Sequence, residues 1–73
     1  LLEVQKDYAE AEPGGIAIAR GLHPRAAGTK GSILGVLQES KHGEIVVARM
    51  MRVSTDWQEL TESGDPISKR TEV

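Results

Sequence analysis

Residues 32–53 read SILGVLQESKHGEIVVARMMRV, two apolar runs joined by a polar connection. The first run is Ser32–Gln38, the second is Glu44–Val53, and Gly43 closes the connection between them. Glycine at this point supplies the positive φ that tight hairpin turns require. Apolar runs of this length, bounded by turn residues, are typical of strands. The segment therefore predicts an antiparallel β-hairpin, and with it a mainly β chain.

The two predicted strands differ in how their apolar residues are distributed. Those of residues 32–38 occupy both faces, which favours burial on both sides. Gly35 in the middle of this strand indicates a bulge or a close backbone approach. In the second strand, Arg49 shares a face with Val47 and Met51. Because an unpaired buried charge is unfavourable, we expect Arg49 to reach an edge or to find an acidic partner.

A further short strand is predicted before the hairpin. Ile16–Ala19 alternates isoleucine with alanine, and Gly21 ends this pattern. Pro24 biases the residue before it away from helix, so residues 22–25 are expected to form a loop. Residues 28–31 read as a turn because they combine two glycines with polar residues.

The segment after the hairpin leaves two interpretations open. Thr55 and Gln58 have the spacing of a capping box, and Gly64 fits the end of a helix, which favours one or two helical turns. The alternative is a loop and a short strand, with Trp57 and Leu60 pointing inward.

The chain divides at Pro13-Gly14-Gly15, which interrupts any regular element. Residues 1–14 are predicted to form an N-terminal arm, and residues 15–73 a single β-rich domain in which residues 67–68 begin a last strand. The expected architecture is a small β-barrel or sandwich-like domain.

Length and composition indicate a thin core. The chain has 73 residues, no cysteine and no phenylalanine, and its only aromatic residues are Tyr8 and Trp57. Small domains that lack disulfides commonly gain stability from a metal ion or from association with another chain. Association is the remaining route, because no metal-ligand spacing is present, and we expect a homo-oligomer.

Charge and hydropathy argue against two classes of partner. Nine basic and eleven acidic residues give a net charge of −2, and no basic cluster stands out, so nucleic-acid binding lacks its electrostatic signature. No apolar run approaches the length that spans a bilayer, so no membrane partner is expected.

The sequence offers no recognisable catalytic, cofactor or metal site. His23 and His42 each lie in a predicted loop without a second ligand at zinc-binding spacing. Ser40 lies near His42, but no carboxylate accompanies them in a way that would orient a nucleophile. We therefore predict a non-enzymatic protein without cofactors.

Two regions are candidate interfaces. The apolar residues of the arm are separated from the core strands by an acidic stretch and are expected to dock on a neighbouring subunit; they are Leu1, Leu2, Val4 and Tyr8. Trp57 is an isolated large aromatic residue, and both a core position and an interface anchor remain open for it.

The order of motifs along the chain resembles that of a known family. A Gly35-Val36-Leu37 strand is followed by a Gly43-Glu44 exit into a valine-rich strand and by a Gly64-Asp65-Pro66 turn. This resembles the small head-decoration, or capsid cement, proteins of tailed bacteriophages. The resemblance implies a β-barrel-like domain on the exterior of the virion that binds the major capsid protein and stabilises the head. It also implies a trimer in many cases, with contacts made by the N-terminal arm.

Two alternatives remain. One is a β adaptor domain of the SH3-like or PDZ-like kind, which binds a peptide or a partner subunit. The other is an accessory subunit of an enzyme, whose active site would be supplied by a partner chain.

Overall fold

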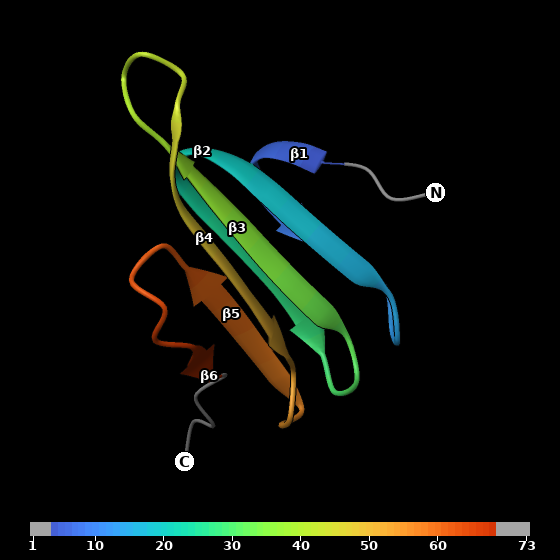
Figure 1. Cartoon of the computed structure of the whole chain (residues 1–73). Helices are drawn as coiled ribbons and strands as arrows, with labels where there is room; N and C mark the ends of the chain where they lie inside the picture. Colours follow the sequence, from blue (N-terminus) through green and yellow to red (C-terminus); the bar gives the residue numbers. More distant parts are fainter. Residues whose placement is uncertain (1–3, 69–73) are drawn as a thin grey trace.

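The computed structural model describes residues 4–68 of the chain. This part contains no helix, and its strands form one six-stranded sheet in the order β4-β3-β2-β5-β6, with β1 paired to β2 (Figure 1). The mainly β prediction is confirmed, because the described residues form strands and no helix, and the sheet curls strongly in the manner of a half-barrel (Figure 1). The strands are β1 (Val4–Glu10), β2 (Ile16–Thr29), β3 (Ile33–Glu39), β4 (Ile45–Arg52), β5 (Trp57–Thr61) and β6 (Ile67–Ser68).

The predicted hairpin is present as β3 and β4. The two strands pair antiparallel from Ile33 opposite Arg52 to Glu39 opposite Ile45, with an irregularity in register near the turn. Gly43 has a φ of 82°, as the turn requires. The tip of the hairpin projects beyond the rest of the sheet (Figure 1).

Strand β2 is the element that curls the sheet. It runs on well past Gly21, where the sequence predicts its end, and folds back on itself, so that it has two arms (Figure 1). The first arm, residues 16–21, pairs parallel with β3, whereas the second arm, residues 25–29, pairs antiparallel with β5. We call the first arm with β3 and β4 the first layer, and the second arm with β5 and β6 the second layer.

The fold-back between the arms has clear physical causes. Pro24 is fully buried there and has no N–H to offer to a neighbouring strand. The side-chain amide of Gln38 donates a hydrogen bond to the Leu22 carbonyl, which satisfies a group that the bend takes out of the ladder. Strand β1 bends along with β2. It does so at Asp7, which lies beside Gly21 and has a left-handed φ of 67°. A Cβ at Gly21 would meet the Asp7 carboxylate, so a larger residue there would require the Asp7 side chain to move.

The fold-back also explains an unusual connection. Strands β1 and β2 are parallel, yet only residues 11–15 separate them, whereas parallel neighbours usually need a crossover of a dozen residues or more. Because β2 doubles back, its end returns towards its start: Gly28 lies against Ser32 and Leu34, and Leu34 pairs with Ala17. A short link is therefore sufficient to bring the chain from the end of β1 to the start of β2.

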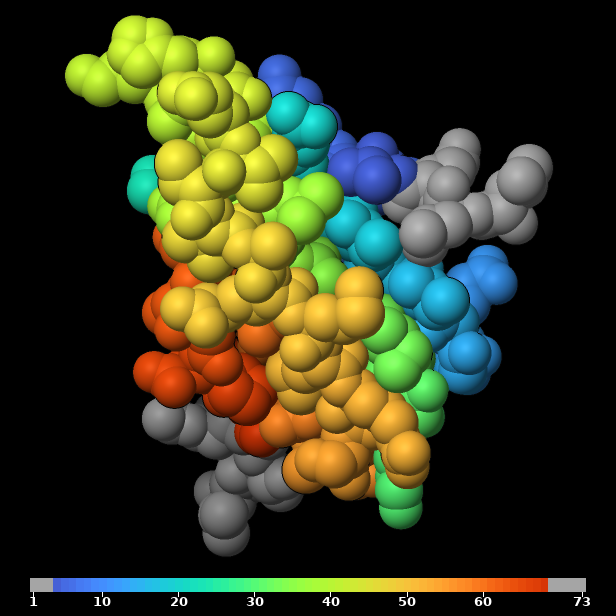
Figure 2. All heavy atoms as spheres, in the orientation of Figure 1, coloured from blue at the N-terminus to red at the C-terminus, as the bar shows by residue number. Residues whose placement is uncertain are grey.

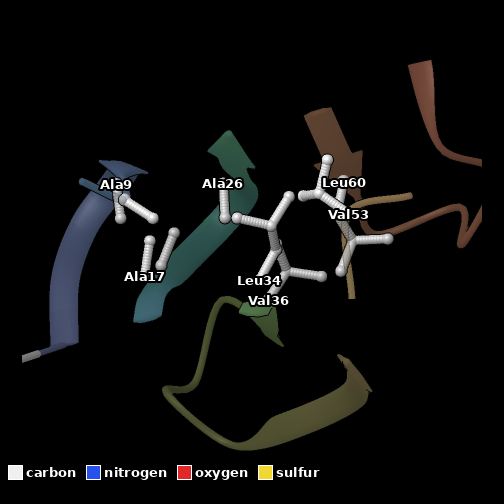
Figure 3. Close-up of a cluster of buried hydrophobic side chains, with 9 residues drawn as sticks. Ala9, Ala17, Ala26, Leu34, Val36, Val53 and Leu60 are labelled. Carbon is white, nitrogen blue, oxygen red and sulfur yellow. The ribbon is translucent and has the colours of Figure 1, made fainter. Parts of the chain in front are cut away.

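The core between the layers consists mainly of small residues. In Figure 3 the alanines of β1 and β2 meet the larger side chains of β3, β5 and the end of the hairpin. Small side chains allow the layers to approach closely, and a Cβ at Gly28 would lie only 3.0–3.2 Å from three atoms around it. The buried apolar residues are Ala9, Ala11, Ala17, Ala19, Ala26, Ala27, Leu34, Val36, Val53 and Leu60.

The segment after the hairpin is a loop and a strand, so the helical interpretation is wrong. In β5 the side chains of Gln58 and Leu60 are buried, whereas Trp57 is only half-buried and does not belong to the core cluster. The expected inward position is therefore confirmed for Leu60 alone. Arg49 reaches the rim of the sheet, where its Nε donates a 2.9 Å hydrogen bond to the Glu62 carbonyl rather than to an acidic side chain.

The structure places most of the predicted arm inside the sheet. Val4–Glu10 form β1, which pairs with both arms of β2, and Ala9 and Ala11 are buried in the core. For these residues the expectation of an arm outside the core is corrected, since alanine is small enough to enter the narrow space between the layers. Leu1 and Leu2 lie outside the described residues.

Candidate protein interface

The first layer carries apolar side chains on its outer face. The register across the strands aligns Val4, Ile18, Gly35 and Met50 in one row on the side opposite the core. Neighbouring rows on the same side contain further aliphatic residues of β2 and β3. We call this surface the apolar face, and define it as Val4, Ile16, Ile18, Ile33, Leu37 and Met50.

These side chains are exposed to a degree that is unusual for aliphatic residues gathered on one surface. Met50 is 68% exposed, Ile16 55% and Val4 52%, and the other three are half-buried. Single exposed apolar residues are ordinary, but contiguous patches of them mark interaction sites. Figure 2 shows β4, β3 and the first arm of β2 side by side on the side that faces the reader.

Basic side chains border the apolar face. Lys6 and Arg20 lie in the row next to that of Val4, and Arg52 lies opposite Ile33. Arg20 forms an ion pair with Glu39. The border is therefore more positive than the chain as a whole, whose net charge is −2. A partner with acidic residues around an apolar patch fits this surface best.

Strand β4 adds an open edge to the same layer. In the part of the chain that the structure describes, β4 pairs with β3 alone, so its other edge has no strand beside it. Six of its eight residues are apolar, and none of the eight is fully buried. Natural proteins usually protect such an edge, because it is a template for pairing with another chain.

The outer face of the second layer is different, because its polar groups are paired within the chain. Arg25 lies 3.3 Å from the Glu59 carboxylate and stacks over the Tyr8 ring at 5.1 Å. Burial raises the pKa of the Tyr8 phenol, the Glu10 and Glu59 carboxylates raise it further, and Arg25 opposes them. Tyr8, Arg25 and Glu59 thus contact one another on this face.

The predicted site residues are thus separated by the fold. Val4 belongs to the apolar face, whereas Tyr8 is engaged by Arg25 on the second layer. Trp57 lies opposite Thr29 at the start of β5, away from the apolar face, and its role as an anchor stays a prediction. Leu1 and Leu2 lie outside the described residues, so their docking also stays a prediction.

Sequence reasoning missed Ile16 and Met50 as candidate interface residues. The alternation of isoleucine with alanine in residues 16–19 indicated that one side of this strand differs from the other. The side with the larger residue is normally assigned to the core, so the isoleucines were not considered for an interface. Here the alanines point inward because the layers are close, and the isoleucines point out.

Ser40 and His23 make hydrogen bonds that support the local structure. The Ser40 hydroxyl accepts hydrogen bonds from the backbone N–H groups of His42 and Glu44, so it organises the hairpin turn. His23 Nδ1 lies 3.1 Å from a carboxylate oxygen of Glu62 on the surface. Within residues 4–68, no three histidine, cysteine or acidic residues gather as metal ligands would, and no helix is long and apolar enough to cross a membrane.

Comparison of the chain with protein-family models, with curated proteins and with solved structures gives no match.

Proposed function

We propose that this protein is a non-enzymatic decoration protein that attaches through its apolar face to the outer surface of a tailed-phage head. The exposure of Met50, Ile16 and Val4 on one sheet face carries this proposal. A small domain with a thin core gains stability when such a face is covered, since full burial of an aliphatic side chain contributes about 1.5–3 kcal/mol. The order of strand and turn motifs that resembles head-decoration proteins supplies the kind of partner.

The basic border supports the same kind of docking. Lys6 and Arg52 flank the apolar face, so an apolar patch with acidic residues on the major capsid protein is the complementary surface. Many copies of such a patch on a closed shell would hold many copies of this chain on the virion exterior.

The experiment compares two changes on β2. Ile16→Glu introduces a charge into the apolar face, and Thr29→Glu introduces the same side chain into the exposed part of the second layer. Phage heads are purified, freed of the protein and incubated with each variant. We expect them to bind the Thr29→Glu variant as tightly as the wild type. The Ile16 variant should bind about tenfold or more weakly, since it loses the burial of one aliphatic side chain.

Circular dichroism provides the folding control. Both positions are exposed, so both variants should melt close to the wild type. Equal binding of the two variants to heads would contradict the proposal.

The second candidate is an adaptor domain that binds an extended peptide. The open edge of β4 favours it, because SH3-like and PDZ-like modules use a sheet edge or a groove beside it for peptides. Selection of a displayed peptide library on the purified chain tests this. If a consensus peptide is selected, and if adding it shifts the NMR amide resonances of β4, the adaptor is favoured over the decoration protein.

A further inference from the structure

A hollow of about 640 Å³ lies where β2 folds back. Strand β1 forms one of its walls and the tip of the β3–β4 hairpin forms the other, with the bend of β2 between them (Figure 1). It is lined by residues 4–7, 20–22 and 39–41 and by Gly43, and we call it the bend hollow. Pockets that bind small molecules commonly have volumes of about 300–1,000 Å³, so the bend hollow has the size of a ligand site.

Hydrogen bonds within the chain hold the tip of the hairpin against the bend. The Arg20 guanidinium donates to the Glu39 carboxylate and, at 3.3 Å, to the Gly43 carbonyl. The Gln38 amide donates to the Leu22 carbonyl at 3.1 Å. Ligand sites are usually largely formed before the ligand arrives. These contacts therefore keep one wall of the bend hollow in place in the free chain.

The other wall contains an unusual backbone conformation. Asp7 has a φ of 67°, and among residues 4–68 it is the only residue other than glycine with a positive φ. Such a φ is uncommon for a residue with a side chain. Backbone conformations of this kind gather at binding sites, where the surrounding structure holds them in place. The bend of β1 at Asp7 is thus a second observation that points to this hollow.

Basic side chains reach the bend hollow from each of the three elements around it. They are Lys6 of β1, Arg20 of β2 and Lys41 of the hairpin tip. Arg20 is paired with Glu39, whereas neither lysine forms an ion pair within residues 4–68. Asp7 is the other acidic residue of the lining, so basic groups outnumber acidic groups by one. The hollow therefore favours a ligand with a single negative charge.

The Ser40 hydroxyl adds a directed hydrogen-bond donor. Its oxygen accepts hydrogen bonds from the backbone N–H groups of His42 and Glu44, at 3.2 and 3.3 Å, and no residue of the described chain accepts the hydroxyl proton. A serine hydroxyl donates one hydrogen bond in addition to those that it accepts. Its proton is therefore free to bind an oxygen of a ligand in the hollow.

Two exposed aliphatic side chains complete the lining. Val4 is 52% exposed and Leu22 is 53% exposed, and both border the bend hollow. An aliphatic ligand group that covers them removes apolar surface from water, which favours binding. The hollow thus combines a basic and hydroxyl-bearing part with an apolar part.

We propose that the bend hollow binds a carboxylate carried on a short aliphatic chain. The carboxylate lies between Lys6 and Lys41 and accepts the proton of Ser40, and the aliphatic chain lies against Val4 and Leu22. This site goes beyond the proposed docking to phage heads and does not depend on it, because all of its groups belong to the free chain.

NMR titration of the isotope-labelled full chain with hexanoate near neutral pH tests the proposal. We expect saturable shifts of the amide resonances of Gly21, Leu22 and Gly43, with a Kd of about 1–10 mM, as suits so small a ligand. Hexanamide has the same shape without the charge, and acetate has the charge without the chain. Each should bind about fivefold or more weakly than hexanoate.

Three lysine variants locate the carboxylate. Lys6→Gln and Lys41→Gln should each weaken hexanoate binding about threefold or more. Lys30→Gln removes the same charge from the exposed turn between β2 and β3, outside the hollow, and should bind hexanoate like the wild type. All three positions are exposed, so circular dichroism should show the same melting for each.

Three results would overturn the proposal: no saturable shift with hexanoate, equal binding of hexanamide, or a loss of affinity in Lys30→Gln as large as that in Lys6→Gln. The comparison of hexanoate with hexanamide uses the unchanged chain, so it stays decisive even where a variant folds poorly. Heads take no part in these measurements, so failure of this site and failure of the proposed function are distinguishable.

Discussion

The outer faces of the two layers differ, although one long strand contributes to both. The first layer exposes Met50 and Ile16 beside an open strand edge, whereas the second layer covers its surface with a local network of Tyr8, Arg25 and Glu59. The first face leaves several aliphatic side chains in water, whereas the second pairs Arg25 with Glu59 and exposes Ile67. The difference teaches that most of the exposed aliphatic residues of the described chain lie on the first layer, which is why the proposed docking surface is placed there.

The two faces of β3 offer the largest contrast to test. Leu34 is fully buried between the layers, and Leu37, on the apolar face, is only half-buried. We expect Leu34→Ala to lower the free energy of unfolding by about 2–5 kcal/mol, enough to unfold much of a small domain, because it leaves a cavity. Leu37→Ala should cost less than half of that. Urea denaturation followed by Trp57 fluorescence measures both, and equal losses would show that the two sides of β3 are equally packed.

Two glycines give a second contrast of intermediate size. A Cβ at Gly28 would lie 3.0 Å from Ser32 Cβ and 3.2 Å from both Ala11 and Leu34, whereas at Gly35 the nearest atom is 3.3 Å away, on the movable side chain of Ile18. We expect Gly28→Ala to destabilise the domain by about 1–3 kcal/mol through overpacking between the layers. Gly35→Ala should be close to neutral. Thermal melts of the two variants decide, and a reversed order would contradict close contact between the layers at Gly28.

A third contrast compares arginines on the two outer faces. Arg25→Ala removes the stacking on Tyr8 and the pair with Glu59, so we expect a loss of about 0.5–1.5 kcal/mol. Arg52→Ala should change the unfolding free energy of the dilute chain by less than about 0.5 kcal/mol, because the side chain is exposed. A larger effect at Arg52 than at Arg25, in urea denaturation at low protein concentration, would reverse the distinction between the faces.

The smallest expected effect is a pH dependence on the second layer. The hydrogen bond with His23 lowers the pKa of the Glu62 carboxyl below its ordinary value of 4.5, with help from a backbone hydrogen bond. A carboxyl group with a lowered pKa stabilises the fold fully above its ordinary value and loses that contribution as pH falls through the folded-state value. Carbon-detected NMR titration should give Glu62 a pKa below 4.5, and His23→Ala should move it back towards 4.5. A pKa at or above 4.5 in the wild type would contradict the contact.

The hairpin and the β class were predictable because they depend on local patterns. Gly43 and the two apolar runs around it specify turn and strands within 22 residues of sequence. The fold-back of β2 was not predictable, since Gly21 and Pro24 indicate a loop equally well and only the neighbouring β1 and β5 keep these residues extended. That distinction depends on contacts between residues far apart in the chain.

The candidate interface could be predicted only in part. Val4 was identified from its position in an apolar start of the chain, and the structure places it on the apolar face. Ile16 and Met50 were not identified, because an amphipathic strand does not reveal which side faces the core when one side is alanine. The fold decides this through the narrow spacing of the layers, which admits Ala17 and Ala19 but not isoleucine.

Oxidation of the two adjacent methionines tests most directly whether the apolar face is covered in the working assembly. Met50 is 68% exposed on that face, and Met51 lies on the opposite side of β4, against the core. We expect dilute hydrogen peroxide to oxidise Met50 rapidly in the dilute free chain and several-fold more slowly in purified heads that carry the protein, whereas Met51 should react slowly in both. Mass spectrometry of the digested protein reads both sites at once, and slow reaction at Met51 confirms that the fold stays intact. Oxidation of Met50 on heads at the rate of the free chain, with Met51 still protected, would show that the apolar face stays in water and would contradict its assignment as the docking surface.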